Sequence, residues 1–128
     1  MIVADASATP AILLTEPERA VFTAKLSDAP SVLMSPVNYW EVLVRANAMD
    51  GAKGVSEAEH VLASFNIQVV SVDIEAARLA AEAFARFGRR TPAGLNLGDC
   101  FAYALARQRS APLLYKGGDF AKTDIAAA

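Results

Sequence analysis

Short apolar runs that alternate with helical stretches limit the fold of this chain more than any other sequence feature. Four runs rich in aliphatic and β-branched residues predict buried strands, at 1–4, 31–35, 67–72 and 111–116. Six stretches between them predict helices, at 6–15, 17–28, 36–49, 56–65, 73–87 and 98–109. Pro17 and Pro36 suit first helical turns, whereas Gly51, Gly54 and Gly88 mark helix ends. This alternation predicts an α/β fold with a parallel sheet covered by helices on both faces.

Length and composition predict one folded domain over residues 1–128. Hydrophobic residues make up 54% of the 128-residue chain and charged residues 20%, which favours a buried core over disorder. The segment 86–98 is the one long loop containing Gly and Pro that the sequence offers.

The cysteine, histidine and charge content excludes several kinds of protein. The single Cys100 cannot form an internal disulfide, which favours the reducing cytoplasm, and with the lone His60 it cannot build a zinc site. The N-terminal run contains an acid, lacks a basic segment and is broken by Pro10, so we expect neither a signal peptide nor a membrane span. The net charge of −2 means that any nucleic-acid contact must come from a local basic cluster.

Three aspartates stand near the ends of predicted strands. Asp5 directly follows the first strand, Asp119 follows the last one, and Asp99 opens the helix that leads into that last strand. Ligands of parallel α/β sheets bind outside the carboxyl ends of the strands. We therefore expect these carboxylates to face one edge of the sheet.

A fourth acid, Glu41, lies within a predicted helix. At helical spacing it shares a side with Val37, Trp40 and Val44, which places its carboxylate on or beside an apolar stripe. A charge in that position is costly unless something neutralises it.

Asp99 lies on the same helix face as the small residues Ala102 and Ala106, which would let its helix approach the sheet closely. We therefore expect this acid to be drawn toward the interior.

Clustered carboxylates call for a proton or a cation. Two of them within about 5 Å repel by roughly 3 kcal/mol at an effective dielectric constant of about 20. Without His or Cys ligands, the preferred ion is Mg²⁺ or Mn²⁺, which binds oxygen, holds phosphate groups and activates water.

Each acid also has a purely structural interpretation. Asp5 could cap a helix, Asp99 could complete a capping box with Asn96, and Asp119 could belong to a turn. Several acids at strand ends are nevertheless hard to explain by independent structural causes.

Four segments together resemble the PIN-domain ribonucleases, specifically the VapC-like toxins of type II toxin–antitoxin pairs. These are "MIVADASA", the glutamate of "VNYWEVLVRA", "LNLGDCFAYALA" and "PLLYKGGDFAKTDI". The resemblance spans the whole chain and implies a three-layer α/β/α sandwich with a central, mostly parallel sheet. It also implies a Mg²⁺- or Mn²⁺-dependent endoribonuclease that acts on RNA and is blocked by a cognate antitoxin.

The resemblance further implies roles for individual residues. Asp5, Glu41 and Asp99 correspond to the main acidic cluster and Asp119 to a fourth, more variable acid. Ser7 corresponds to a hydroxyl that orients the first aspartate or a metal-bound water, with helix capping as the alternative.

Thr123 and Asp124 match the tail motif of the family, where they either support the site or close a turn. Of these two roles, we favour the structural one.

Basic and apolar side chains around the site predict contacts with partners. The candidates for RNA binding are Arg86, Arg89, Arg90, Lys116 and Lys122. The candidates for an antitoxin groove or a homodimer seam are Val21, Phe22, Leu26, Leu43 and Val61. The aromatic residues beside the acids are expected to pack in the core or in an interface: Tyr39, Trp40, Phe101 and Tyr103.

Two other functions remain open from the sequence. In a phosphoacceptor signalling domain, Asp5, Asp73 and Lys116 would form the phosphorylation site, although Asp73 is equally explained as a helix cap. A non-catalytic PIN-like scaffold would keep the fold and bind partners only.

Overall fold

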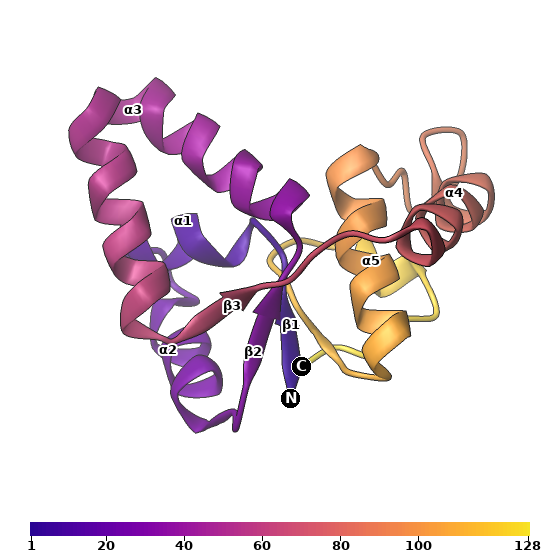
Figure 1. Ribbon diagram of the computed structural model, residues 1–128, viewed down its shortest axis with the longest axis horizontal. Helices are drawn as coiled ribbons and strands as arrows, with labels where there is room; N and C mark the ends of the chain where they lie inside the picture. Colours follow the sequence, from indigo (N-terminus) through magenta and orange to yellow (C-terminus); the bar gives the residue numbers. More distant parts are fainter.

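The computed structural model describes residues 1–128, which form four strands, five α-helices and one 3₁₀ turn (Figure 1). The strands are β1 (Ile2–Ala4), β2 (Val32–Met34), β3 (Ile67–Val69) and β4 (Leu113–Leu114). The helices are α1 (Ala8–Leu13), α2 (Arg19–Asp28), α3 (Pro36–Ser64), α4 (Ile74–Phe87) and α5 (Leu97–Arg109), followed by the 3₁₀ turn η1 (Phe120–Lys122).

The sheet has the order β3-β2-β1-β4, and every neighbouring pair is parallel. Helices α1, α2 and α3 lie on one side of it, and α4 and α5 on the other (Figure 1). The predicted three-layer α/β/α sandwich with a parallel sheet is therefore confirmed.

Alternate residues of the central strands supply two separate cores, as expected for strands buried on both faces. Val3 and Leu33 pack with α4 and α5, whereas Ala4, Val32 and Met34 pack with α1, α2 and α3. Because both faces are covered, open space beside the sheet is left at the ends of its strands.

The chain between β2 and β3 forms helix α3, which contains a sharp break. Asp50 and Gly51 leave helical geometry, and Gly51 has φ +56° and ψ −146°, a conformation suited to glycine. The two predicted helices thus correspond to the two halves of α3, and Gly51 marks the end of the first half as expected. Gly54 instead lies buried in the second half, where a Cβ would approach the Ala46 carbonyl oxygen to 2.4 Å.

Several predicted element boundaries are wrong. The strands predicted at 67–72 and 111–116 are shorter and end at Val69 and Leu114, although the Val70 amide still donates to the Met34 carbonyl. The helix expected at 17–28 begins only at Arg19, so Pro17 lies in the preceding turn. None of the helices is both long and apolar enough to cross a membrane.

The C-terminal tail returns to the sheet beside β4. Ala127 forms a parallel bridge with Leu113, whose amide donates a hydrogen bond to the carbonyl of Ala126. The tail is also tied to α5, because the hydroxyl of Tyr103 donates to Asp124 Oδ1 over 2.6 Å.

Candidate functional site

Asp5 lies where β1 ends, and its backbone amide still pairs with the sheet through the carbonyl of Leu114. The residue is only 5% exposed. Its side chain accepts hydrogen bonds from the Ser7 hydroxyl at 2.6 Å and the Ser7 amide at 3.1 Å. Burial raises the pKa of the Asp5 carboxyl above its usual range, and the Ser7 hydrogen bonds oppose this increase only in part.

Glu41 comes from the first half of α3, but the buried face of that helix is not the predicted one. Trp40 and Val44 are exposed, by 62% and 45%. The residues that face the core are Asn38, Val42 and Ala46. The expected apolar stripe therefore lies on the surface, because hydrophobic residues on a helix do not reveal which side meets the sheet.

Asn38 links three parts of the site and was missed by the sequence analysis. It is fully buried, and its Nδ2 lies 3.4 Å from Asp5 Oδ1, 3.0 Å from Glu41 Oε1 and 3.0 Å from the Gly98 carbonyl oxygen. The available sequence signal was a polar residue one helical turn before Glu41 and in line with Val42 and Ala46.

The Glu41 carboxylate also packs against the start of α5. A Cβ on Gly98 would lie 2.1 Å from Glu41 Oε1, so only glycine leaves room for the carboxylate. Burial raises the pKa of Glu41, the Asn38 hydrogen bond lowers it, and the nearby Asp5 raises it again.

Asp99 combines the capping role with a place among the acids. Asn96 is the N-cap of α5 and accepts from the Asp99 amide, while Asp99 Oδ2 accepts from the Asn96 amide at 3.0 Å, which completes the predicted capping box. Burial raises the Asp99 pKa to about 6, opposed by the Asn96 hydrogen bond and reinforced by Asp5, Glu41 and Asp119. Ala102 and Ala106 are buried beneath it, as expected.

The carboxylates of all four predicted acids are thus close enough for their charges to interact. Asp119 is the exposed member of the set, at the start of η1, and makes no side-chain capping bond there.

Lys116 does not point into this acidic set. Its ammonium group pairs with Glu16 and lies 3.4 Å from Glu18 Oε2, both in the segment before α2. Its backbone amide does support the site, because it donates to Ser7 Oγ at 2.9 Å. Lys116 therefore supports the site through its main chain, whereas its ammonium group, expected to contact RNA, forms ion pairs away from the acids.

Thr123 serves the tail. Its hydroxyl donates to the carbonyl of Phe120 at 2.7 Å and accepts from the amide of Ile125 at 3.2 Å. These bonds close the turn after η1, which agrees with the structural interpretation of Thr123.

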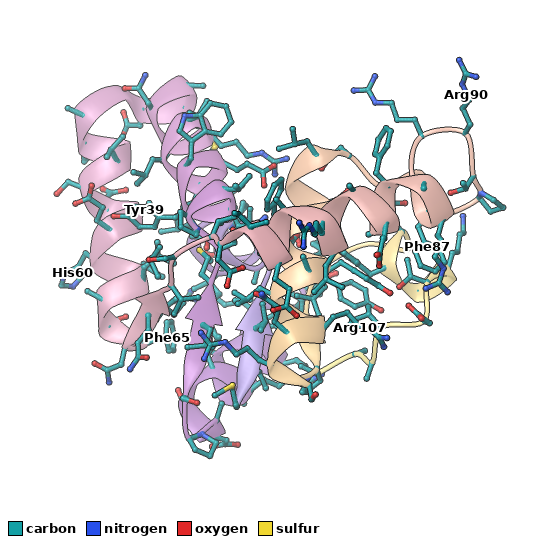
Figure 2. All side chains as sticks on the ribbon, turned by 45° about the vertical axis from the view of Figure 1, so that its right-hand side comes forward. Tyr39, His60, Phe65, Phe87, Arg90 and Arg107 are labelled. Carbon is teal, nitrogen blue, oxygen red and sulfur yellow. The ribbon has the colours of Figure 1, made fainter.

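The predicted basic residues differ in whether they pair with an acidic side chain. Arg86 forms an exposed ion pair with Asp124 at 3.4 Å and lies over the ring of Phe87. Arg89 and Arg90 are exposed on the loop after α4, where Figure 2 shows Arg90 projecting outward and His60 at the opposite side of the molecule. Arg45, which the sequence analysis missed, is the cation whose charge lowers the pKa of both Asp5 and Glu41.

The carboxylate oxygens of the site are ligands of the kind that hard divalent ions prefer. No three side chains of His, Cys, Asp or Glu are arranged closely enough to enclose an ion by themselves. Mg²⁺ typically keeps several waters and takes only one or two carboxylates from a protein. One or two of the carboxylates of Asp5, Glu41 and Asp99 could bind such an ion directly, with the remaining carboxylate reaching it through bound water.

Comparison with known proteins assigns this arrangement to a family. A family model described as "PIN domain" matches residues 2–126. The chain belongs to the PIN-domain family. A "Ribonuclease VapC" from Mycolicibacterium smegmatis is 39% identical to this PIN domain over 127 residues, covering 98% of each chain. The predicted resemblance to VapC ribonucleases is therefore confirmed.

Solved structures support the fold of this PIN domain. VapC20 of Mycobacterium tuberculosis, described as a Sarcin-Ricin loop cleaving toxin, superposes with a TM-score of 0.80 at 19% identity, covering 100% of this chain and 98% of that one. A toxin–antitoxin complex from Klebsiella pneumoniae contains a chain with a TM-score of 0.74 at 16% identity, covering 100% and 97%. At these identities the likeness concerns the fold.

The phosphoacceptor alternative is overturned by the family assignment. In this PIN domain Asp73 is the N-cap of α4, where it accepts from the Ala76 amide at 2.8 Å and from Gln108 Nε2 at 3.0 Å. Its carboxylate thus has a structural role.

The apolar residues expected to pack in the core or to contact partners differ in how deeply they are buried. Phe22 and Leu26 are buried in the core and offer little surface to a partner, although Leu26 borders a hollow beside the start of β2. Of the aromatic residues expected in the core or in an interface, Tyr103 is buried in the core, whereas Trp40 is exposed, so the interface role remains a prediction for it.

Proposed function

We propose that residues 1–128 act as one domain, a Mg²⁺- or Mn²⁺-dependent endoribonuclease that serves as the toxin of a type II toxin–antitoxin pair. The observation that carries this proposal is the meeting of Asp5, Glu41 and Asp99 from three different elements, with Asp119 at the rim. Their like charges raise one another's proton affinity, which a divalent cation would relieve. The 39% identity to a VapC ribonuclease supports RNA as the substrate.

Each residue has a distinct part in this proposed mechanism. Asp5, Glu41 and Asp99 would hold the ion, directly or through its bound waters, and Asp119 would complete its surroundings or orient a water molecule. The bound ion supplies positive charge at the phosphodiester and lowers the pKa of water. Ser7 fixes the Asp5 carboxylate by donating to Oδ2, and the Lys116 amide fixes the Ser7 oxygen in turn.

The surroundings of the site support contact with RNA. Arg89 and Arg90 are exposed and make no salt bridge, and Lys122 on η1 is also exposed, close in sequence to Asp119. Exposed cations of this kind would contact phosphates and position the strand without reading its sequence.

Two protein partners form part of the proposal. A hollow of about 230 Å³ between α1 and α3, lined by Leu13, Leu14 and Met49 among others, would receive an antitoxin segment. The known toxin–antitoxin complex with this fold supports such a partner. A second copy of the chain would cover the exposed apolar side chains of α4 and α5, which include Phe84 and Leu97 at 49% and 66% exposure. We place this activity in the cytoplasm, where RNA is available.

The test is cleavage of purified total RNA with Mg²⁺ or Mn²⁺, with excess chelator, and with the Asp5→Asn variant. We expect cleavage only with the metal and the intact aspartate. Cleavage that persists in chelator, or an Asp5→Asn variant as active as the parent, would contradict the metal-dependent mechanism. Expression in cells should arrest growth, and Asp99→Ala should abolish the arrest. An intact protein that binds antitoxin but cuts no RNA would instead indicate the non-catalytic scaffold.

A further inference from the structure

One buried amide lies between two of the acids that the proposed function assigns to the metal. Asn38 is fully buried on α3, and its Nδ2 faces oxygens of Asp5, Glu41 and Gly98 at 3.0 to 3.4 Å. An amide nitrogen carries two hydrogens, so three acceptors share two donors. Asn38 therefore connects the end of β1, the first half of α3 and the start of α5.

The orientation of this amide follows from its neighbours. Turning the group over would set Oδ1 against three oxygen atoms that cannot donate while the acids are ionised, which is repulsive. In the observed orientation, Oδ1 is buried without any hydrogen-bond partner. An unpartnered buried acceptor lowers the free energy of unfolding. The hydrogen bonds from Asn38 Nδ2 to the acids have to offset that loss.

Gly98 contacts both Asn38 and Glu41 from the start of α5. The Glu41 carboxylate lies where a Gly98 Cβ would be, and the Gly98 carbonyl accepts from Asn38. Asp99 is the next residue, held by its capping box at the first turn of α5. Because Asp99 directly follows Gly98, holding Gly98 against Asn38 also fixes the position from which the Asp99 side chain extends.

We propose that Asn38 is a positioning residue that holds the Asp5 and Glu41 carboxylates together, and both against the start of α5, before any cation binds. This inference rests on the proposed metal-dependent function. The amide hydrogens supply partial positive charge between two like-charged groups, so the pair does not have to spread apart when the ion is absent. The ion then enters a site that is already arranged, and its affinity includes no cost for gathering the ligands.

The test is Mn²⁺ binding measured by titration calorimetry on the whole protein, with RNA cleavage measured in parallel. Asn38→Leu keeps the branched shape of the side chain, although it is larger, and it removes both the donors and the unpartnered oxygen. We expect its Kd for Mn²⁺ to rise about 10- to 100-fold, the range typical for residues that orient metal ligands. We also expect kcat at saturating Mn²⁺ to recover most of its value, since Asn38 arranges the carboxylates without touching the reacting atoms.

Two controls separate positioning from folding. Asn47→Leu makes the same change on an exposed position of α3 and should leave Mn²⁺ affinity unchanged. Asn38→Ser keeps one donor in a smaller side chain and should bind Mn²⁺ more tightly than Asn38→Leu.

The opposite results would overturn the proposal. One is an Asn38→Leu protein that melts cooperatively and binds Mn²⁺ as tightly as the parent. If Asn38→Leu does not fold, equal Mn²⁺ affinity of Asn38→Ser and the parent would overturn it instead. A parent protein that binds no Mn²⁺ would contradict the proposed function itself, which is a distinguishable outcome.

Discussion

Replacing Asp99 by asparagine should stabilise the protein at alkaline pH while removing its activity. The folded protein holds the Asp99 pKa at about 6, against an ordinary value of 3.8, first because of burial and then because of the neighbouring acids. The folded state therefore binds the proton more tightly than the unfolded state. Stability from this group is fully present below pH 3.8 and is lost as the pH rises toward 6, so that above 6 the ionised carboxylate is a constant cost.

The size of that cost follows from the pKa difference. At about 1.4 kcal/mol for each pKa unit, the difference corresponds to about 3 kcal/mol without screening. Because the carboxylate is only partly buried, solvent screening reduces this to about 1 to 2 kcal/mol. Asp99→Asn keeps an oxygen that can accept from the Asn96 amide, but it loses a favourable charge at the helix N-terminus, about 0.3 to 1 kcal/mol. The net gain should be about 1 kcal/mol at pH 8, or roughly 3 °C in Tm for a chain of this length.

Urea denaturation of both proteins, at about pH 4 and pH 8 without divalent ions, measures this effect. We expect a gain in unfolding free energy at the higher pH and none, or a small loss, at the lower. Asp73→Asn is the matched control, because hydrogen bonds from the Ala76 amide and then from Gln108 lower the Asp73 pKa. Stability from Asp73 is therefore present above its unfolded pKa, and this variant should be less stable at pH 8. If Asp99→Asn is equally destabilised at both pH values, the acids do not repel one another and the reasoning fails.

Three further substitutions test individual contacts. Gly98→Ala should leave the circular dichroism spectrum unchanged but lower RNA cleavage about 10- to 100-fold, because the new methyl group would displace the Glu41 carboxylate; unchanged cleavage would contradict this packing. Ser7→Ala should lower the free energy of unfolding by about 1 to 2 kcal/mol, measured with urea, since it loses two hydrogen bonds at the strand end; an effect below about 0.3 kcal/mol would contradict their importance. Tyr103→Phe should cost about 1 kcal/mol through the lost bond to Asp124 without changing cleavage, and a large loss of cleavage would instead implicate the tail in the site.

The sequence could predict the acids that depend on sheet topology. Asp5 and Asp119 follow strands, and Asp99 begins the helix before the last strand, so their meeting follows from parallel strand order alone. The capping box at Asn96 was also predictable, because its contacts span only three residues.

What the sequence could not predict depends on packing between distant segments. The choice of buried face on α3 depends on contacts with the sheet, and the apolar Trp40 suggested the wrong one. Asn38 was missed for the same reason, since a polar residue adds nothing to a hydrophobic pattern. Lys116 is close to Asp119 in the chain, but its ammonium group pairs with acids 98 and 100 residues earlier, which no local spacing reveals.

Hydrogen bonds within the protein satisfy both carboxylate oxygens of Asp5 but only one oxygen each of Glu41 and Asp99. Ser7 and Asn38 occupy both oxygens of Asp5, whereas Glu41 Oε2 and Asp99 Oδ1 accept no hydrogen bond within the protein. The bonds that exist hold the acids in place. The free oxygens of Glu41 and Asp99 remain available to a cation, and each Asp5 oxygen keeps lone-pair capacity beyond the hydrogen bonds that it accepts. Satisfying every oxygen would lower the cost of burial but remove the ligands, so the instability expected of ionised Asp99 at neutral pH is a consequence of keeping the site able to bind.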